Sequence, residues 1–460
     1  MSHGPGAVFI DLDRTLLRSA SGPVIQEALV AEGVLEEGKH LPGDQLMYAF
    51  YNRFGESAAF MGLARAAARV MRNRSAAATS RAGERAVAPL LELVQPWALE
   101  ALDEHRRRGL TLVLATTSPH DLVDPLSAAL GFDGTIATRY EEREGLYTGN
   151  LVGGFVWGTG KRREAKRWAE EHGIDLAASH AYSDSFYDLP LLSAVGHPHP
   201  LNADPRLALV AVARRWPLEN WDRPPGIPSI LGLEPYHLAR LLFRPEAFPY
   251  ARFRLSGVEH IPHQGPVLLA ANHRSYFDVA AIGVVAARLN RPVRFMAKRE
   301  LFDAPVVGQL ARALGGIMVD RESRTSEPMR QAAAALRAGE LVIVLPQGTI
   351  PRGKAFFDPV LVGKTGAARL AAETGATLVP LGVWGTEEVW PRNAKVPNMT
   401  NLLHPPTVTV TVGEPLTLGG TDVVADTERL MADIAGLLPE RSRVVHEPTE
   451  EELARTRPSA

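Results

Sequence analysis

The chain contains no cysteine, no long apolar run and no large excess of either charge. Disulfides, thiolate metal sites and cysteine nucleophiles are therefore excluded. A formal net charge of −2 gives no general attraction for nucleic acid, and we expect no nucleic-acid partner. The apolar runs stay far below the roughly 18–20 residues that span a bilayer. The start Met-Ser-His-Gly-Pro-Gly leads directly into a strand-like run and predicts no signal peptide. We expect a cytoplasmic protein that meets a membrane only peripherally, at its surface.

A length of 460 residues and a hydrophobic content of 45% predict two or three domains. Seven prolines between Trp216 and Pro249 indicate a linker rather than a regular element. We therefore place a first domain at 1–217, a linker at 218–249, a second domain at 250–446 and a charged tail, expected to be frayed, at 447–460.

Apolar runs that alternate with helix-forming stretches indicate an α/β fold in both domains, with parallel sheets covered by helices. In the first domain we expect a Rossmann-like sheet with strands near 7–10, 110–115 and 178–183, a helix at 161–172, and an all-helical cap at about 17–108. In the second we expect strands at 266–271, 293–298, 316–320, 341–345, 377–384 and 407–412.

Two carboxylates follow the first predicted strand. Asp11 and Asp13 lie two residues apart, so the side-chain period of a strand directs both the same way, with Leu12 turned to the core. Such a pair suits phosphoryl transfer, because one carboxylate can attack phosphorus while the other protonates the leaving oxygen. A divalent cation then has to offset the charge between carboxylate and phosphate, which predicts Mg²⁺ as cofactor.

Further polar groups follow later strands in an order that fits the same chemistry. They are Thr116, Lys161 and the pair Asp184 and Asp188. A hydroxyl and an ammonium can hold phosphate oxygens, and carboxylates can hold the cation. Together with Asp11 this set resembles the haloacid dehalogenase superfamily, in its phosphoserine-phosphatase-like branch with a helical cap, over about residues 7–215.

The resemblance implies a role for each matching residue. Asp11 is implied as nucleophile and Asp13 as acid/base, with Thr116 and Lys161 as the phosphate-binding residues. The implied metal ligands are Asp11, Asp13 through its carbonyl, Asp184 and, in support, Asp188. Arg14 stands where many members have glycine. Taken one at a time, such acids are more often solvated loop residues or helix caps.

The second domain opens with an apolar run followed by Asn272-His273-Arg274-Ser275-Tyr276-Phe277-Asp278. In a continuous helix, residues five apart point about 140° away from each other, so contact between His273 and Asp278 needs a strand-to-turn or loop-to-helix transition between them. A carboxylate on one imidazole nitrogen lets the other nitrogen deprotonate an alcohol, which can then attack a thioester.

This His-x-x-x-x-Asp pattern resembles the signature of the lysophosphatidate and glycerol-3-phosphate acyltransferases. Further blocks of that family are matched at 315–321, 346–349 and 379–381, so the resemblance covers roughly residues 250–420 and implies a glycerolipid-acyltransferase fold. It implies His273 and Asp278 as catalytic residues, Arg321 as a contact to the acceptor phosphate, and Gly348 and Thr349 as pocket residues.

The third block departs from the family pattern. Gln347 stands where glutamate is usual, and Ile350 stands where arginine is usual. The missing cation can be supplied from nearby by Arg352 or Lys364, or else the acceptor differs from lysophosphatidate.

Aromatic and basic residues between 236 and 254 suit a segment that lies on anionic lipid, although the same aromatics can instead dock the linker on the second domain. The whole predicts a bifunctional enzyme of phospholipid biosynthesis. It would acylate 1-acyl-sn-glycerol-3-phosphate, a lysophospholipid, from acyl-CoA or acyl carrier protein, and hydrolyse a phosphomonoester. Two alternatives are a phosphatase whose second domain acylates another acceptor, and one whose second domain is a lipid-binding membrane tether.

Overall fold

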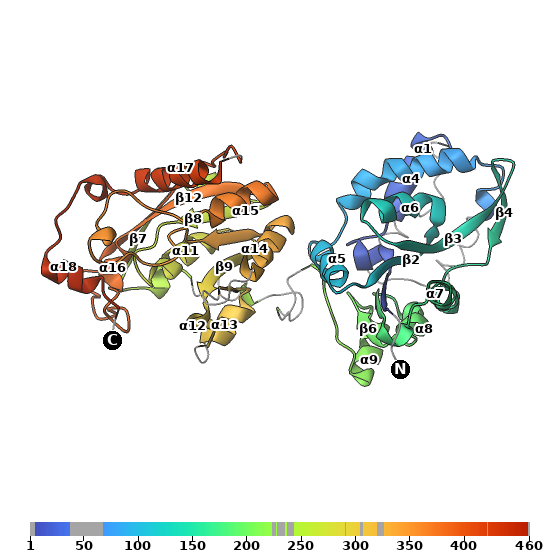
Figure 1. Cartoon of the computed structure of the whole chain (residues 1–460), viewed down its shortest axis with the longest axis horizontal. Coiled ribbons are helices and arrows are strands. Elements are labelled where there is room, and N and C mark those ends of the chain that lie inside the picture. The colour runs from blue at the N-terminus through green and yellow to red at the C-terminus, as the bar shows by residue number, and fades with distance from the viewer. Residues whose placement is uncertain are drawn as a thin grey trace. The chain divides into compact units, whose positions relative to one another are not determined.

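The computed structural model describes residues 5–36, 68–222, 227, 235–236, 243–289, 291–303, 307–319, 326–420 and 422–458. The chain divides into two compact units, Met1–Pro225 and Gly226–Ala460. The division falls inside the segment that the prolines mark as a linker. Each unit has its own sheet (Figure 1).

The first unit is built on a six-stranded sheet with the spatial order β4-β3-β2-β1-β5-β6. Its strands are β1 (Ala7–Ile10), β2 (Thr111–Pro119), β3 (Gly134–Arg143), β4 (Leu146–Val152), β5 (His180–Ser183) and β6 (His197–Pro200). Neighbours are parallel except β3 and β4, which form an antiparallel pair. The three expected strands are confirmed. The β3–β4 pair and β6 were not predicted, because their sequences are polar or rich in proline.

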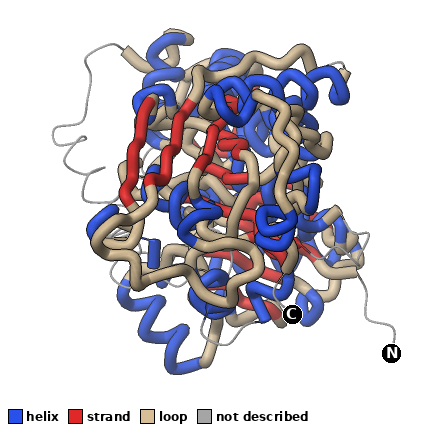
Figure 2. Tube along the Cα trace, turned by 90° about the vertical axis from the view of Figure 1, so that its left-hand side faces the viewer, coloured by secondary structure: helices blue, strands red, loops and turns tan. Residues whose placement is uncertain are grey.

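Helices flank the sheet of the first unit (Figure 1), and Figure 2 traces the helices and strands of the chain from another side. The flanking helices are α1 (Gly22–Ala31), α4 (Ala76–Leu91), α5 (Ala98–Arg107), α6 (His120–Ala129), α7 (Thr159–His172), α8 (Leu189–Leu192) and α9 (Pro205–Arg214). Residues 37–67 of the expected cap lie outside the described residues. α5, which the sequence analysis assigned to the cap, packs against the sheet instead, where His105 Nε2 lies 2.8 Å from the Tyr182 hydroxyl.

The second unit contains a seven-stranded sheet with the order β10-β9-β11-β8-β12-β13-β7. Its strands are β7 (Arg252–Ser256), β8 (Val267–Ala271), β9 (Val293–Lys298), β10 (Ile317–Val319), β11 (Leu341–Val344), β12 (Thr377–Trp384) and β13 (Thr407–Val412). Only β12 and β13 pair antiparallel. All six expected strands are present. β7 is an additional edge strand, in which exposed arginines alternate with half-buried apolar residues.

The helices of this unit are α11 (Asp278–Ala286), α12 (Arg299–Asp303), α13 (Val307–Ala313), α14 (Glu327–Arg337), α15 (Gly366–Thr374), α16 (Thr386–Val389), α17 (Val423–Gly436) and α18 (Glu450–Arg455). The expectation of a frayed tail is wrong for the described residues 447–458. Thr449 and Glu452 form a capping box that starts α18, and Gly353 N donates to Thr456 Oγ1 at 2.9 Å.

The aromatics at 243–253 dock on the second unit rather than forming a free lipid-facing segment. The rings of Phe248, Tyr250 and Phe253 lie with their centroids 5.6, 6.1 and 6.1 Å from that of Phe277. These rings pack against the buried core around β8 and α11. Among the described residues, no helix is long and apolar enough to cross a membrane.

Four histidines gather between β5, β6 and α5. His180 stacks on His197 with ring centroids 4.6 Å apart, and its Nδ1 lies 2.8 Å from Nε2 of His199. Nδ1 of His199 lies 2.6 Å from a Glu219 carboxylate oxygen. Burial lowers the pKa of His105 to about 4 and that of His180 to about 3, and neighbouring positive charges and imidazoles add to the effect. The folded unit therefore holds both rings neutral.

Stability of the first unit should fall in acid because of these histidines. Their folded pKa values lie below the ordinary 6.5, so their contribution is complete above pH 6.5 and is lost as the pH falls towards 4. At pH 5 the expected loss for His105 is roughly 2 kcal/mol. Hydrogen exchange of β5 amides, corrected for intrinsic rates, should show weaker protection at pH 5 than at pH 7.5. His180→Phe should narrow that difference, whereas the same change at exposed His263 should leave it intact.

Candidate functional site

The first site lies at the carboxyl edge of the first sheet, in the turn after β1. Asp11 directly follows the fully buried strand and has only 7% of its surface exposed. Its backbone N–H donates to Tyr182 O of β5 at 3.0 Å. The chain then turns sharply, with Arg14 in the left-handed region at φ +59°, and Leu16 N donates to Asp11 O at 3.1 Å. The turn keeps Asp11 and Asp13 at the end of β1.

Lys161, at the start of α7, joins two carboxylates in the centre of this site. Its Nζ donates to Asp11 Oδ1 at 2.8 Å and to Asp188 Oδ2 at 2.6 Å, and the side chain is fully buried. Ser183 Oγ also donates to Asp188 Oδ2, at 2.7 Å. Gly160 lets the start of α7 lie close to the backbone of Phe155, since a Cβ at Gly160 would lie 2.3 Å from Phe155 O. A buried ammonium of this kind needs such partners, and it supplies positive charge beside Asp11.

Thr15 links the remaining carboxylate to the same centre. Its Oγ1 lies 3.4 Å from Asp11 Oδ2 and 3.4 Å from Asp184 Oδ1, and it accepts from Asp184 N at 3.0 Å. One hydroxyl carries one proton, so it can donate to only one of the two acids at a time. The sequence analysis gave Thr15 no role, although its place four residues after Asp11 was visible.

Asp13 lies on the same turn in a different environment. It is half-buried, and its Oδ1 accepts from Ser21 N at 2.5 Å. Loss of hydration raises the pKa of Asp13 above its ordinary value, and the Ser21 hydrogen bond and the charge of Lys161 offset part of that rise. A carboxyl that keeps its proton to higher pH suits a general acid.

Thr116 lies at the same edge by strand register. β1 and β2 are parallel with Ile10 opposite Leu114, so Thr116 stands level with the turn that follows Asp11. It is buried, and its Oγ1 accepts from Ser118 N at 3.1 Å. The structure thus brings all six predicted residues of the first site to one edge of the sheet.

The oxygen atoms of this edge fit a hard divalent cation. Oδ1 of Asp188 is buried and has no hydrogen-bond partner, and Asp11 and Asp184 face a common hydroxyl. Carboxylate oxygens are the ligands that Mg²⁺ prefers. Within the described ranges, no three or more histidine, aspartate or glutamate side chains are grouped closely enough to hold a metal by themselves. Arg14 Nε lies 2.9 Å from Asp184 Oδ2, so a guanidinium occupies one side of this acid.

The second site lies at the carboxyl edge of the second sheet, in the turn between β8 and α11. His273 Nδ1 lies 2.7 Å from Asp278 Oδ2. Asp278 begins α11 and has no exposed surface. The chain makes the predicted change from strand to turn to helix between them. With a carboxylate on Nδ1, the proton belongs on that nitrogen and the lone pair on Nε2.

Three further donors hold the Asp278 carboxylate. Arg274 N and Ser275 N donate to Oδ2 at 2.7 and 2.9 Å, and Thr386 Oγ1 donates to Oδ1 at 2.5 Å. The carboxylate also sits at the N-terminus of α11, where the helix dipole favours negative charge. The carboxylate is therefore fixed in place beside the imidazole.

Two amide side chains fix the turn to neighbouring strands. Asn272 Nδ2 donates to Val383 O at 2.9 Å, and Val383 N donates to Asn272 Oδ1 at 2.7 Å, so the side chain continues the pairing of β8 with β12. Gln347 Oε1, just beyond β11, accepts from His273 N at 2.7 Å. Gln347, the unusual residue of the third block, thus holds the histidine backbone. Sequence reasoning missed both contacts because they join distant segments.

The other third-block residues lie around this edge. Gly348 has φ +68°, with Lys364 packed against it, and Thr349 is half-buried. Arg352 is exposed. Arg321 lies outside the described residues.

Arg392 is a basic residue that the sequence analysis did not select. It is 5% exposed, and its Nη1 donates to the carbonyl of Ile350, which stands where the family usually has arginine. Burial and the nearby charge of Arg352 both lower the pKa of Arg392, and a hydrogen bond to Tyr276 partly opposes them. A cation from another segment therefore reaches the place where the third block lacks one.

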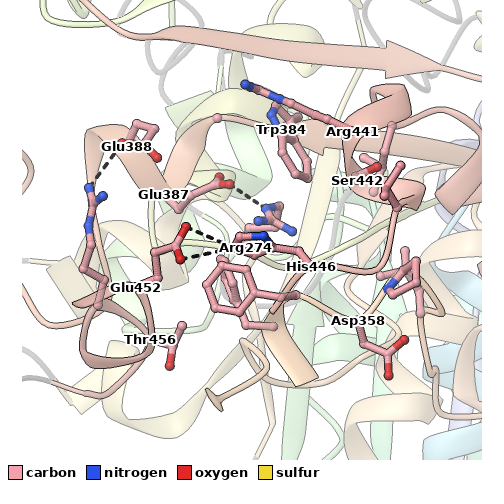
Figure 3. A pocket seen from close by; sticks show the side chains of 18 of the residues that line it. Arg274, Asp358, Trp384, Glu387, Glu388, Arg441, Ser442, His446, Glu452 and Thr456 are labelled. Atoms are coloured by element: carbon pink, nitrogen blue, oxygen red, sulfur yellow. Dashed lines mark hydrogen bonds and ion pairs between the residues drawn. The ribbon is translucent and has the colours of Figure 1, made fainter. Parts of the chain in front are cut away.

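Two cavities border the turn between β8 and α11, which carries His273. One, of about 150 Å³, is lined almost entirely by apolar residues of α11, β9 and β11, including Val279, Ile282 and Phe295. The other, of about 580 Å³, is lined in part by Arg274, the residue after His273 (Figure 3). There Arg274 stacks between Phe356 and Trp384, and its Nε lies 2.8 Å from Glu387 Oε1.

Comparison with known families gives one match in each of the two units. Residues 8–193 match the family of haloacid dehalogenase-like hydrolases, and residues 252–384 match the acyltransferase family. The chain is 37% identical over 128 residues to a Streptomyces azureus protein named for inhibition of morphological differentiation, covering 28% of this chain and 46% of that protein. It is 34% identical over 139 residues to a phosphoserine phosphatase of Mycobacterium tuberculosis, covering 29% of this chain and 45% of that protein. The chain thus spans less than half the length of these two relatives.

A solved structure resembles the second unit. It is the 1-acyl-sn-glycerophosphate acyltransferase of Thermotoga maritima, which is 23% identical, covers 45% of this chain and 85% of that one, and gives a TM-score of 0.32.

Replacing Arg14 should change metal binding. Arg14→Gly removes a cation next to Asp184 and suits the positive φ at this position, so the affinity for Mg²⁺ should rise several-fold because less positive charge competes for the carboxylate. Titration calorimetry of the full chain with Mg²⁺ alone measures this directly. Arg143→Ala, which removes an exposed arginine from the same unit, should leave the affinity unchanged; equal affinities for wild type and Arg14→Gly would contradict the expectation.

Proposed function

Because the chain joins a haloacid dehalogenase-like hydrolase domain to an acyltransferase domain, we propose that it is a bifunctional enzyme of phospholipid biosynthesis. The acyltransferase half transfers an acyl group from acyl-CoA or acyl carrier protein to 1-acyl-sn-glycerol-3-phosphate, forming phosphatidate. The phosphatase half hydrolyses a phosphomonoester with Mg²⁺ as cofactor. The observation that carries the first activity is the 2.7 Å contact between His273 and Asp278.

In the acyltransferase half, His273 works as the general base. Nε2 takes the proton of the acceptor hydroxyl, and the hydroxyl oxygen attacks the thioester carbonyl. The tetrahedral intermediate collapses, the carbon–sulfur bond breaks, and the proton passes from Nε2 to the leaving thiolate. Asp278 stabilises the imidazolium that exists between the two proton transfers.

The surroundings of this pair suggest how the substrates are held. The apolar cavity beside α11 suits an acyl chain, because its lining has few polar atoms to leave unsatisfied. Arg392 and Arg352 offer positive charge for the acceptor phosphate near the third block, together with Arg321 as the family resemblance implies.

In the phosphatase half, an Asp11 carboxylate oxygen attacks phosphorus and Asp13 gives its proton to the leaving oxygen. Asp13 then takes a proton from water, which attacks the phosphorus of the aspartyl phosphate, so that phosphate leaves and Asp11 is restored. Lys161 and Thr116 hold the phosphate oxygens. Asp11, Asp184 and the Asp13 carbonyl, with Asp188 in support, would hold Mg²⁺, which would offset the negative charge between carboxylate and phosphate.

Two alternatives concern the second half. The buried Ile350 and the engaged Gln347 give the third block a different surface from the usual one, which favours a different acyl acceptor. A membrane tether without catalysis would not need the buried Asp278 carboxylate to be held by four partners, one of which is the His273 imidazole. We therefore keep acyl transfer as the proposal. We place the protein in the cytoplasm, at the surface of the membrane that holds its lipid substrates.

Reciprocal variants of the full chain test the two activities separately. Asp11→Asn should reduce Mg²⁺-dependent phosphate release by at least about a thousandfold and leave acyl transfer intact. His273→Ala should reduce thiol release from acyl-CoA with lysophosphatidate by at least about a hundredfold and leave phosphate release intact. Thiol release that is unchanged in His273→Ala would overturn the base role. Phosphate release from phosphoserine but not from phosphatidate would separate the phosphatase from the lipid pathway.

Gln347 should act through the position of His273. Gln347→Met removes the acceptor for His273 N and should lower kcat roughly fivefold with little change in KM, because the backbone of the base loses one hydrogen bond worth about 1 kcal/mol. Gln347→Glu keeps an acceptor oxygen and should stay close to wild type. If both variants behave alike, the hydrogen bond does not position the base.

A further inference from the structure

The second unit exposes four valines on two neighbouring segments. Val360 and Val362 are 69% and 77% exposed, and Val444 and Val445 are 65% and 79% exposed. The segments touch beside these residues, where the rings of Phe357 and His446 lie 5.5 Å apart. Single exposed apolar residues are ordinary, but four exposed branched side chains on adjoining segments form a patch. We call these four residues the valine patch.

The segments that carry the valine patch are fixed to the unit. Arg455 of α18 lies 3.2 Å from Glu388 Oε2, and Gly353 N donates to Thr456 Oγ1 at 2.9 Å. Arg443 Nη2 donates to the carbonyls of Gly436 and Leu438 at the end of α17. The valines therefore project from an anchored surface rather than from a frayed end.

The charge around the valine patch favours an anionic partner. Within 352–364 and 439–458 the exposed basic side chains are Arg352, Lys354, Lys364, Arg441, Arg443, Arg455 and Arg457, and the exposed acids are Asp358, Glu440, Glu447, Glu450 and Glu451. One acid, Glu447, lies 3.6 Å from Lys354 and is partly neutralised by it. Apolar side chains flanked by excess positive charge suit the interface of a bilayer that contains anionic lipid.

The larger cavity connects the valine patch to the turn between β8 and α11, which carries His273 and Arg274. Leu361, Val444 and Val445 line this cavity together with Arg274, the residue after His273, which Figure 3 labels. Two charged-group atoms among its lining residues, Glu387 Oε2 and Arg392 Nε, are buried without a hydrogen-bond partner. A polar head that enters between the two segments would find these atoms while its apolar part stays with the valines.

We propose that the valine patch docks the acyltransferase unit on an anionic lipid surface and presents the larger cavity to it. This inference rests on the proposed function, because a lipid substrate gives the unit a reason to approach a bilayer. The valine patch, rather than the segment at 236–254, is then the surface that contacts lipid, because the described aromatics at 243–253 are packed against the unit. The docked orientation places the opening beside Val444 and Val445 at the lipid surface.

Vesicle binding of the full chain tests the proposal. The variant carrying V360T, V362T, V444T and V445T keeps branched shapes but adds hydroxyls, and its partition onto phosphatidylglycerol–phosphatidylcholine vesicles should fall at least tenfold. Wild type should bind pure phosphatidylcholine vesicles more weakly. The matched control is L209T with V212T on α9, where the native side chains are 74% and 67% exposed. That control should bind vesicles as wild type does.

Two further measurements separate docking from catalysis. With a short-chain, water-soluble thioester and acceptor, the V360T and V362T double variant, whose residues do not line the cavity, should turn over at the wild-type rate, whereas transfer by the four-valine variant to an acceptor embedded in vesicles should fall at least tenfold. Vesicle binding equal to wild type in that variant would overturn the docking proposal. A lipid-free dimer that the variant dissociates, seen by light scattering, would also overturn it in favour of a second copy. If wild type fails on both kinds of substrate, the acyltransferase proposal fails, whatever the vesicles show.

Discussion

A carboxylate without exposed surface has to be matched by donors, and the site in the second unit is arranged around one such group, Asp278. Two backbone N–H groups, one hydroxyl and the His273 imidazole surround it. Those four contacts dictate the shape of the turn, the tautomer of the histidine and the approach of the segment after β12. The first unit follows the same rule with opposite charge, since the buried Lys161 is held between Asp11 and Asp188. In both units, parallel strands deliver the charged residues to one edge.

Much of this arrangement could be predicted from the sequence, because it depends on local patterns. Each β strand that carries site residues has an apolar run with turn residues behind it, and the strands around Asp11 and His273 were placed within a residue or two. The elements that were missed have no such pattern. β6 reads His-Pro-His-Pro, and β7 alternates arginine with apolar residues at a sheet edge. The capped α18 was mistaken for a frayed tail because a charge-rich segment can also be a docked helix.

The partners of the site residues could not be predicted, because each joins segments that are far apart in the chain. Thr15 lies 169 residues from Asp184, and Gln347 lies 74 residues from His273. Only the pairing of the strands shows that these side chains meet. The same holds for Arg392, which reaches the buried Ile350 from the segment after β12. The sequence pointed instead to Arg352 or Lys364, which lie near the third block in the chain.

The turn between β8 and α11 depends on long-range contacts, and these also affect when the turn can form during synthesis. Asn272 bonds to Val383 across 111 residues, and Thr386 bonds to Asp278 across 108. Contacts of such separation form late, since the intervening chain has to close a large loop first. The first unit also needs such contacts, since Lys161 meets Asp11 across 150 residues, but its chain leaves the ribosome first, and domains emerge and fold in order from the N-terminus. A nascent chain can therefore assemble the site around Asp11 well before the site around His273, which is complete only when β12 has joined the sheet.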